Sequence, residues 1–451
     1  MYYQVPQHID KEKVFFINRS DIAGRLEPEF YRPSIASLEK RIRSLATHKL
    51  KDFALYMAGG ATPKKTEADK YYSDSGSGIP FLRVQNLQTN GELSLDDCVY
   101  INKETHNGLL QRSQVAEGDL LVKITGVGRM AIASVAPKGF VGNTNQHMVV
   151  IKTGDADVSK YLARYLNLDF IERIASRHST GGTRPALDYP SLKNIPIIEG
   201  IDFSIVDEAI SIKKQKEQQV EDILNSIDDY LLGELHIKLP ETKLQTLQDR
   251  IFTVNINEIR DGRMDPKSVL FLGEHAKSET YENVQLKKIA TIVKGDSITS
   301  DKVNKNGQYP VIAGGQTSPY NHDKYNFKSD VITVSASGAY SGYLWYHDNP
   351  IFASDCSVIY AKNSQFITKY IYEVLKAQQS QIYLLQQGAG QPHVYPDDLS
   401  KLWIPVVPLV KQKEIVNHIT AIRQQAKALQ QEGIEVLEQA KQKVESMIIC
   451  K

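Results

Sequence analysis

Ile22-Ala23-Gly24-Arg25-Leu26-Glu27-Pro28, near the start of the chain, returns as Ile259-Arg260-Asp261-Gly262-Arg263-Met264-Asp265-Pro266, about 237 positions later. Gly181-Gly182-Thr183-Arg184-Pro185 likewise returns as Gly388-Ala389-Gly390-Gln391-Pro392, about 207 positions later. Repeats of solenoid proteins are much shorter, about 20 to 50 residues. The spacing therefore predicts two related domains in one chain, and a pseudo-two-fold object.

The second copy is shorter than the first by about 25 to 30 residues, because the distance between matching motifs falls along the chain. We expect the missing residues to lie between Ala290 and Ser329, opposite residues 73–78 and 83–86 of the first copy. The two copies are thus predicted to share a framework and to differ most in this stretch.

Length and composition are those of an ordinary globular protein. The 451 residues are 41% hydrophobic and 24% charged, which suits two domains with their own cores. Three cysteines, Cys98, Cys356 and Cys450, are far apart and lack metal-ligand spacing, so we expect reduced thiols in the cytoplasm and no metal site. The start shows no secretory signal and no apolar run approaches the ~20 residues of a membrane span. The net charge of +1 argues against a protein that simply coats polyanions.

Each copy divides into a strand-like, loop-rich part and a long helix. Short β-branched runs alternate with Gly, Asn, Ser and Pro over the first part, and helices are expected at residues 159–176 and 366–385. Long helices are expected at about 204–235 and at the C-terminus. Apolar residues recur every seven positions in both, which predicts a coiled-coil seam. The expected seam consists of Val220, Ile223, Ile227, Tyr230, Ile415, Ile419, Ile422, Ala426, Leu429 and Val436, with Leu224, Leu231, Gly433, Ala440 and Met447 as further members. Alternatively, each helix is amphipathic and lies on its own domain.

The sequence contains no catalytic motif on which a reaction could be based. It lacks a phosphate-binding loop and a dinucleotide fingerprint. Asn349-Pro350-Ile351-Phe352 departs from the base-holding loop of adenine methyltransferases and is predicted to be a turn. The histidines lack metal-ligand spacing, and adjacent acids such as Asp96-Asp97 point to opposite faces of a strand. We therefore predict no catalytic residues, no bound metal and no cofactor of the chain's own.

The loops are rich in side chains that recognise base edges of DNA. Arg pairs well with guanine, and Asn or Gln with adenine, through two hydrogen bonds each. In the first copy the candidate DNA-binding residues are Arg83, Gln85, Asn86, Lys123, Thr125, Arg129, Asn143, Asn145, Gln146, Thr180 and Arg184. In the second copy they are Lys294, Gln316, Thr317, Ser337, Tyr340, Tyr343, Gln391 and His393. The alternative for each is ordinary solvated loop polarity.

The order of these motifs resembles a known family. Ile404-Pro405 followed by Pro408-Leu409-Val410-Lys411-Gln412-Lys413-Glu414-Ile415-Val416 is similar to the entry of the conserved helix in type I restriction–modification specificity subunits, with Lys411 where that family usually has Glu. Gly118-Asp119-Leu120-Leu121, Gly126, Gly128 and Met148-Val149-Val150-Ile151 resemble the body of the family's target-recognition domain. Gly181-Gly182-Thr183-Arg184-Pro185 resembles its closing corner.

The resemblance implies an α+β fold, in which two repeated mixed α/β target-recognition domains are separated by two long antiparallel coiled-coil helices. The expected boundaries are 1–200 for the first domain, 201–250 for the central helix and linker, 251–405 for the second domain and 406–451 for the C-terminal helix. Each domain would read one half of a bipartite target in double-stranded DNA, and the helices would set the spacer.

The same resemblance implies a non-catalytic subunit whose partners supply the chemistry. Modification subunits, two of them, would bring S-adenosylmethionine and the methyltransferase site, and a restriction/translocase subunit would join them; no membrane partner is expected. Two alternatives remain open at this stage. The chain could be the specificity subunit of another methylating defence system, such as a type IIB-like one, or a two-domain coiled-coil scaffold for other proteins.

Overall fold

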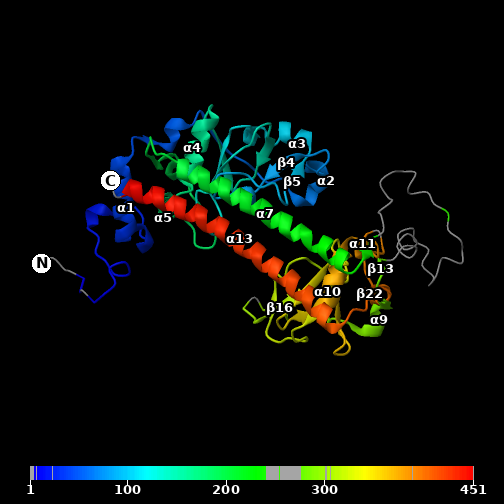
Figure 1. Ribbon diagram of the computed structural model, residues 1–451. Helices are drawn as coiled ribbons and strands as arrows, with labels where there is room; N and C mark the ends of the chain where they lie inside the picture. The colour runs from blue at the N-terminus through cyan, green and yellow to red at the C-terminus, as the bar shows by residue number, and fades with distance from the viewer. Residues whose placement is uncertain are drawn as a thin grey trace. The chain divides into compact units, whose positions relative to one another are not determined.

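The computed structural model describes residues 5–6, 8–22, 24–239, 253, 276–299, 302–304, 306–388 and 390–449. The second copy of the opening motif, residues 259–266, lies outside the described residues, as do Ala389 of the second Gly-rich corner and Cys450. The chain forms two compact units (Figure 1). Unit 1 comprises Met1–Glu217 with Gln430–Lys451, and unit 2 comprises Gln218–Leu429.

Unit 1 is built on a four-stranded antiparallel sheet. Its strand order is β2 (Tyr56–Gly59), β10 (Met148–Lys152), β7 (Leu120–Lys123) and β8 (Ala133–Val135). Val149 of β10 lies opposite Gly59 on one side and Val122 on the other. All four residues of β7 are buried, as expected for a central strand with both faces covered.

A second sheet and a strand pair complete the β-structure of unit 1. The five-stranded sheet has the order β3 (Tyr72–Ser73), β5 (Val99–Ile101), β4 (Ile79–Leu82), β9 (Val141–Thr144) and β6 (Gln114–Ala116). Strands β4 and β9 are parallel, whereas the other pairs are antiparallel. The separate antiparallel pair joins β1 (His48–Lys49) and β11 (Pro196–Ile197).

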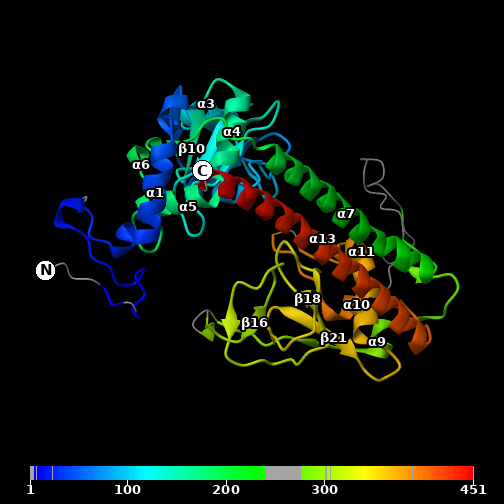
Figure 2. The same cartoon turned by 60° about the vertical axis from the view of Figure 1, so that its left-hand side comes forward.

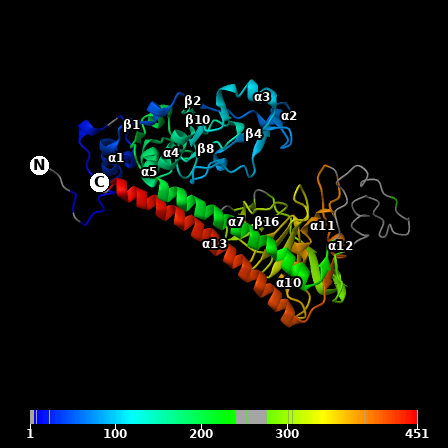
Figure 3. The ribbon, with the colours of Figure 1, turned by 45° about the horizontal axis from the view of Figure 1, so that its top comes forward.

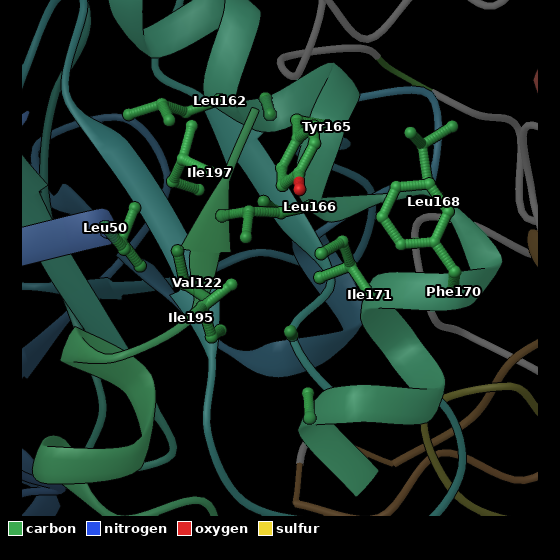
Figure 4. Close-up of a cluster of buried hydrophobic side chains, with 14 of the residues drawn as sticks. Leu50, Val122, Leu162, Tyr165, Leu166, Leu168, Phe170, Ile171, Ile195 and Ile197 are labelled. Carbon is green, nitrogen blue, oxygen red and sulfur yellow. The ribbon is translucent and has the colours of Figure 1, made fainter. Parts of the chain in front are cut away.

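The helices of unit 1 pack on these sheets. They are α1 (Pro33–Leu45), α2 (Ala68–Tyr71), α3 (Lys103–Asn107), α4 (Ala156–Leu166), α5 (Asp169–His178) and α6 (Tyr189–Lys193), with 3-10 helices η1 (Arg19–Asp21), η2 (Pro28–Tyr31), η3 (Leu50–Phe53), η4 (Lys65–Glu67), η5 (Val84–Asn86) and η6 (Gln111–Ser113). Helix α4 covers β7 and β8 (Figure 3). The core beneath it includes Leu50, Val122, Tyr165 and Ile197 (Figure 4).

The single helix expected at residues 159–176 is wrong, because the structure has two helices there. The chain leaves α4 at Asn167, whose buried side chain exchanges hydrogen bonds with the backbone of Ala133 at 2.7 and 3.2 Å. The helix expected at 366–385 is divided in the same way. Helix α10 (Thr368–Ala377) ends at Gln378, and α11 (Gln379–Tyr383) follows. At each break a buried side-chain amide also donates to a carbonyl in the last turn of the helix that ends there.

Unit 2 repeats the topology of unit 1. Its antiparallel sheet has the order β15 (Ala290–Lys294), β21 (Cys356–Ala361), β18 (Val331–Ser335) and β19 (Leu344–His347). Helix α10 lies against β18, β19 and β21 (Figure 2). The strand pair β14 (Asn283–Gln285) with β22 (Trp403–Pro405) corresponds to β1 with β11. The remaining elements are α9 (Leu286–Ile289), α12 (Pro396–Leu399), β12 (Ile237–Lys238), β13 (Lys277–Ser278), β16 (Tyr309–Ile312), β17 (Asn321–His322) and β20 (Phe352–Ala353).

The second copy is shortened mainly after the parallel strand. Strands β16 and β20 pair in parallel, as β4 and β9 do. Leu82 and Leu120 are 38 positions apart, whereas Ile312 and Val331 are 19 positions apart. Strand β17 is the counterpart of β5, because it pairs with β16 as β5 pairs with β4. The residues that unit 1 has in addition form α3 and β6 and a longer connection from β4 to β5. The expected place of the loss, between Ala290 and Ser329, is confirmed.

Two long helices, α7 (Ser204–Glu234) and α13 (Leu409–Ile449), each contribute a section to both units. In unit 1, Lys216 forms an ion pair with Glu432, and Gly433 lies against Lys213. In unit 2, the rings of Tyr230 and His418 are 4.1 Å apart and Lys411 forms an ion pair with Glu234. Residue numbers rise along one helix as they fall along the other, so the sections are antiparallel within each unit. Lys411, the departure from the family pattern, thus pairs with an acid of the other helix.

The seam residues also belong to the domain cores. Ile227, Ile415 and Ile419 join the core of unit 2, so packing on the domains accounts for part of their burial. Two of the expected seam members are wrong, because Leu224 is 40% exposed and Met447 is 48% exposed. Near the C-terminus Ala440 of the expected seam is buried, and so are Leu437, Val444 and Ile448. An α-helix has 3.6 residues per turn, so a strict seven-residue pattern drifts off the buried face. An unbroken coiled-coil seam stays a prediction.

Candidate nucleic-acid interface

Four loops of unit 1 meet at one end of the four-stranded sheet. The amide of Ile124, after β7, donates to the carbonyl of His147 at 2.9 Å, and the amide of Gly126 donates to the carbonyl of Pro185 at 3.0 Å. The hydroxyl of Thr62, after β2, donates to the side chain of Gln146. The Gly-rich corner and the loops after β2, β7 and β9 therefore form one continuous surface, which we call loop surface 1 (residues 60–65, 124–130, 144–147 and 180–186).

Glycine is required where these loops approach one another. A Cβ atom on Gly60 would lie 1.7 Å from the carbonyl oxygen of Thr144, so a side chain there would collide with backbone. Gly126 and Gly128 have φ of 123° and 80°, which favour glycine. The Gly-x-Gly stretch is thus a tight turn at the tip of the β7–β8 connection, where it presents the exposed Val127.

Of the first-copy candidates, four have exposed side chains and three of these lie on loop surface 1. Gln146, Thr180 and Arg184 are exposed there, and Thr125 is half-buried beside them. Gln85 is also exposed but belongs to η5. Its neighbour Arg83 donates to the carbonyl of Asp97 at 2.7 Å, which directs that side chain towards the loop before β5.

Three asparagines expected to read bases are buried. Asn86 is fully buried and donates to the carbonyl of Ser94 at 2.9 Å. Asn143 is fully buried and donates to the carbonyl of Leu110 at 2.9 Å, while its oxygen meets the ring of His106. Asn145 accepts a hydrogen bond from the backbone of His147. These buried amides hold loops in place and are not available to the edges of bases.

Two basic candidates of the first copy also have internal partners. Lys123 is 3% exposed and its ammonium donates to the carbonyl of Val127 at 2.8 Å, which fixes the tip of the glycine turn. Burial lowers the pKa of Lys123. Arg129 pairs with Asp169 and donates to the carbonyl of Asn167 at 2.6 Å. Lys123 and Arg129 thus position the β7–β8 connection on the start of α5.

The corresponding loops of unit 2 also converge. The amide of Ala336 donates to the carbonyl of Asp355 at 3.1 Å, and the amide of Gly338 donates to the carbonyl of Pro392 at 3.0 Å. A Cβ atom on Gly314 would lie 2.7 Å from the carbonyl oxygen of Ser337, so the loop after β16 reaches the same place. We call this loop surface 2 (residues 294–298, 313–318, 336–343, 353–355, 386–388 and 390–396).

The second-copy candidates lie on or beside loop surface 2. Lys294, Gln316, Thr317, Tyr340 and Gln391 are exposed, and Ser337, Tyr343 and His393 are half-buried. Lys294 and His393 line a cavity of about 400 Å³, together with Ser297, Ala336, Asp355 and Tyr395. Tyr343 has the ammonium of Lys376 4.4 Å from its ring centre. The structure thus brings together most of the candidate DNA-binding residues of the second copy, but only part of those of the first copy.

Sequence reasoning missed three members of these surfaces, Thr62, Asp355 and Tyr395. Asp355 is exposed and accepts a hydrogen bond from the hydroxyl of Ser337. The ring of Tyr395 stacks on His393 with centroids 6.0 Å apart. The repeat itself contains the signal for Asp355, because this residue occupies the position that Gln146 has in the first copy.

The part of the chain that the structure describes contains no helix long and apolar enough to cross a bilayer. Within the same residues, no three or more His, Cys, Asp or Glu side chains are grouped as metal ligands. Cys98 and Cys356 are free thiols.

A duplicated α+β scaffold with two sets of converging polar loops defines a two-domain recognition protein. The family model of the type I restriction modification DNA specificity domain matches the chain twice, at residues 44–222 and 278–439. The chain therefore belongs to this family. It is a type I restriction–modification specificity subunit with two target-recognition domains.

Known relatives and solved structures are similar to this chain at low sequence identity. A type I specificity subunit of Mycoplasma pneumoniae is 25% identical over 47% of this chain and 78% of its own length, and a second one from the same organism is 26% identical over 42% and 72%. The S subunit structure from M. genitalium is 13% identical, with a TM-score of 0.41 over 88% of this chain and 95% of that chain. A subunit of a type I R-M system studied for complex assembly and conformational transition has 13% identity and a TM-score of 0.44, over 87% and 96%.

Proposed function

We propose that each unit reads one half of a bipartite target in double-stranded DNA, through loop surface 1 in the first unit and loop surface 2 in the second. One observation carries this proposal: the same loops of the repeated fold converge in both units but present different side chains. A shared framework with different exposed groups suits two readers of different half-sites. Hydrogen bonds to base edges in the major groove supply such discrimination, about 1–3 kcal/mol for a good two-bond contact.

The chain is proposed to select DNA and to leave catalysis to partner subunits. Modification subunits, two of them in our proposal, would bring S-adenosylmethionine and the methyltransferase site, and a restriction/translocase subunit would complete the assembly in the cytoplasm. The absence of a phosphate loop and of a cofactor-binding glycine motif from the sequence supports this division. The net charge of +1 supports it as well, because partners that close around the duplex can supply the phosphate contacts.

The two long helices are proposed to set the spacer between the half-sites. Each half-site alone offers few contacts, so one unit binds weakly. Rigid linkage makes the second contact intramolecular and raises the overall affinity. The antiparallel sections of α7 and α13 within each unit support this proposal, since they tie each reader to both helices.

Methylation sequencing tests the proposed function. The chain is co-expressed with its modification subunits in cells without other DNA methylation, and residues 55–200 are then replaced by those of a related specificity subunit. We expect a split, adenine-methylated motif that changes in one half only. The reciprocal control, replacing residues 291–403, should change the other half. A methylated motif that stays unchanged after both exchanges would contradict the proposal and favour a scaffold that binds no DNA.

A further inference from the structure

Gln146 and Asp355 occupy the same position of the repeated fold. A Cβ atom on Gly60 would collide with the carbonyls of Thr144 and Asn145, and one on Gly295 would collide with those of Ala353 and Ser354. The residue that follows is Gln146 in the first case and Asp355 in the second. The parallel strand pairs agree, because Thr144 pairs with Leu82 as Ala353 pairs with Ile312. The next amide, of Asn145 or Ser354, donates to the carbonyl of that partner in each unit. The connection onward is one residue shorter in unit 2, since Asp355 directly precedes β21 whereas His147 stands between Gln146 and β10.

Both side chains are exposed and each is oriented by a hydroxyl group. Thr62 donates to the amide oxygen Oε1 of Gln146, which leaves the NH₂ group to face outward. The ring of His147 lies 3.4 Å from that nitrogen and can take one of its two hydrogens, so one donor remains. Ser337 donates to Oδ2 of Asp355. A carboxylate has no hydrogen of its own, so the remaining oxygen Oδ1 offers only acceptor sites.

The surroundings of Asp355 match the chemistry of a base edge. Asp355 lines the cavity of about 400 Å³ on loop surface 2, together with Lys294, His393 and Tyr395. Phosphate oxygens carry negative charge and would repel this carboxylate, whereas an amino group of a base would donate to it. A negative group on a DNA-reading surface is therefore most easily explained by a donor on the bases.

We propose that Gln146 and Asp355 are the matching specificity-determining residues of the two units, with opposite hydrogen-bond polarity; this inference rests on the proposed function. Asp355 accepts from the exocyclic amino group of a cytosine in the second half-site. Adenine fits less well, because its N7 acceptor lies beside its amino group and would face the carboxylate. Gln146 donates to an acceptor edge of a purine, N7 or O6, in the first half-site.

Isosteric variants reverse the polarity at each position. Asp355→Asn replaces an acceptor oxygen by an NH₂ donor while Ser337 can still donate to the remaining oxygen. Gln146→Glu replaces the NH₂ donor by an oxygen while Thr62 can still donate. The matched controls are Asp348→Asn for Asp355→Asn and Asn107→Asp for Gln146→Glu. They make the same charge changes at exposed positions outside the two loop surfaces. The chain is co-expressed with its modification subunits, and methylated motifs are sequenced.

We expect Asp355→Asn to lower methylation of the original motif roughly tenfold or more, which corresponds to one lost base contact. One base pair of the second half-site should change or lose its preference, and the first half-site should stay as it was. Gln146→Glu should act on the first half-site alone. Asp355→Ala, which removes the group without reversing it, should relax the same base pair.

Three results would overturn the inference. Asp355→Asn could act no more strongly than Asp348→Asn, or Gln146→Glu no more strongly than Asn107→Asp. Either variant could also change both half-sites together, which would indicate a general loss of folding or DNA affinity. Failure of the proposed function gives a different result, since the wild-type complex would then produce no bipartite methylated motif at all.

Discussion

The hydroxyl of Tyr370 donates a hydrogen bond to the carbonyl oxygen of Pro405 at 2.9 Å, and both groups are buried in unit 2. Tyr165 makes the same bond to Pro196 in unit 1, also at 2.9 Å. In each unit this bond ties the helix that covers the sheet to the Ile-Pro strand, which leads on to the long helix. Burial raises the pKa of both tyrosines, so each hydroxyl keeps the proton that it donates.

Removing either hydroxyl should weaken its own unit. We expect Tyr370→Phe to lower the free energy of unfolding by about 1–3 kcal/mol, because the buried proline carbonyl loses its donor. Tyr165→Phe should have a similar effect on unit 1. Thermal unfolding followed by calorimetry measures the change. Tyr320→Phe, at a residue that is 49% exposed, is the matched control and should stay within about 0.5 kcal/mol of wild type. Equal effects of Tyr320→Phe and Tyr370→Phe would contradict the role of the bond.

The framework of the fold could be predicted from the sequence because repeated motifs and apolar spacing report on local structure. The duplication, the two long helices and the place of the shortened stretch follow from such patterns. The division of each shorter helix did not, because it depends on a contact with a distant strand. Asn is a weak helix former that also occurs within helices, so only the bonds of Asn167 to Ala133 show why the chain turns there.

The candidate site was harder to predict because polar loop residues have two different uses. Asn143 and Gln146 look alike in the sequence, yet Asn143 is buried by its bond to Leu110 while Gln146 faces solvent. The partner of a buried amide lies far away along the chain, so no local pattern distinguishes the two. Asp355 was missed because acids are usually excluded from DNA-binding surfaces. Its equivalence to Gln146 becomes visible only when the two copies are compared through their strand register.

Glu39 should make unit 1 sensitive to acid. Its side chain, 5% exposed, accepts hydrogen bonds from Arg177 at 2.6 Å and Arg43 at 2.7 Å, and His178 lies at 2.9 Å. Burial by itself would raise the pKa of Glu39, but the hydrogen bonds and positive charges of His178 and Arg43 outweigh it and lower the pKa to about 2. The folded-state pKa is below the unfolded one, so the carboxylate stabilises the fold above about pH 4.5 and this stabilisation is lost as the pH falls through 2.

Glu39→Gln tests this pH dependence. A depression of this size corresponds to roughly 3 kcal/mol at pH 5, so the variant should be less stable than wild type by about that amount there. The difference should shrink as the pH falls towards 2, because the wild-type carboxylate becomes protonated. Urea unfolding at pH 5, 3.5 and 2 provides the measurement. Glu29→Gln, at an exposed surface pair, should be nearly neutral at every pH. A constant difference between Glu39→Gln and wild type would show that packing, not charge, stabilises this cluster.

Lys123 and Arg184 should differ in how they affect DNA binding. Arg184 is exposed on loop surface 1, so Arg184→Gln should reduce the salt dependence of DNA binding, the slope of log K against log salt, by about one unit if it contacts a phosphate. Lys123 is buried and holds the Val127 carbonyl. Lys123→Met should therefore leave the slope unchanged while it weakens discrimination at the first half-site. Binding of the complete complex is measured over a range of salt concentrations. An equal fall in slope for Lys123→Met would show that this ammonium reaches a phosphate.

The spacer should grow when both long helices are lengthened together. The division between the units falls after Glu217 in α7 and after Leu429 in α13. Seven residues inserted at both points keep the Lys216–Glu432 pair within unit 1 and the Lys411–Glu234 pair within unit 2. Seven residues add about 10 Å of helix and turn it to within about 20° of its former face. This length corresponds to about three base pairs of B-DNA.

We therefore expect the matched insertion to lengthen the unspecified gap by about three base pairs while both half-sites stay the same, as read by methylation sequencing. The insertion in α7 alone is the control. It shifts α7 against α13 by two turns, so one of the two sets of helix contacts must break, and methylation should be lost or strongly reduced. An unchanged gap after the matched insertion would mean that the helices support the two readers without measuring the distance between them. Loss of both half-sites after the matched insertion would place the helices in the recognition surfaces themselves.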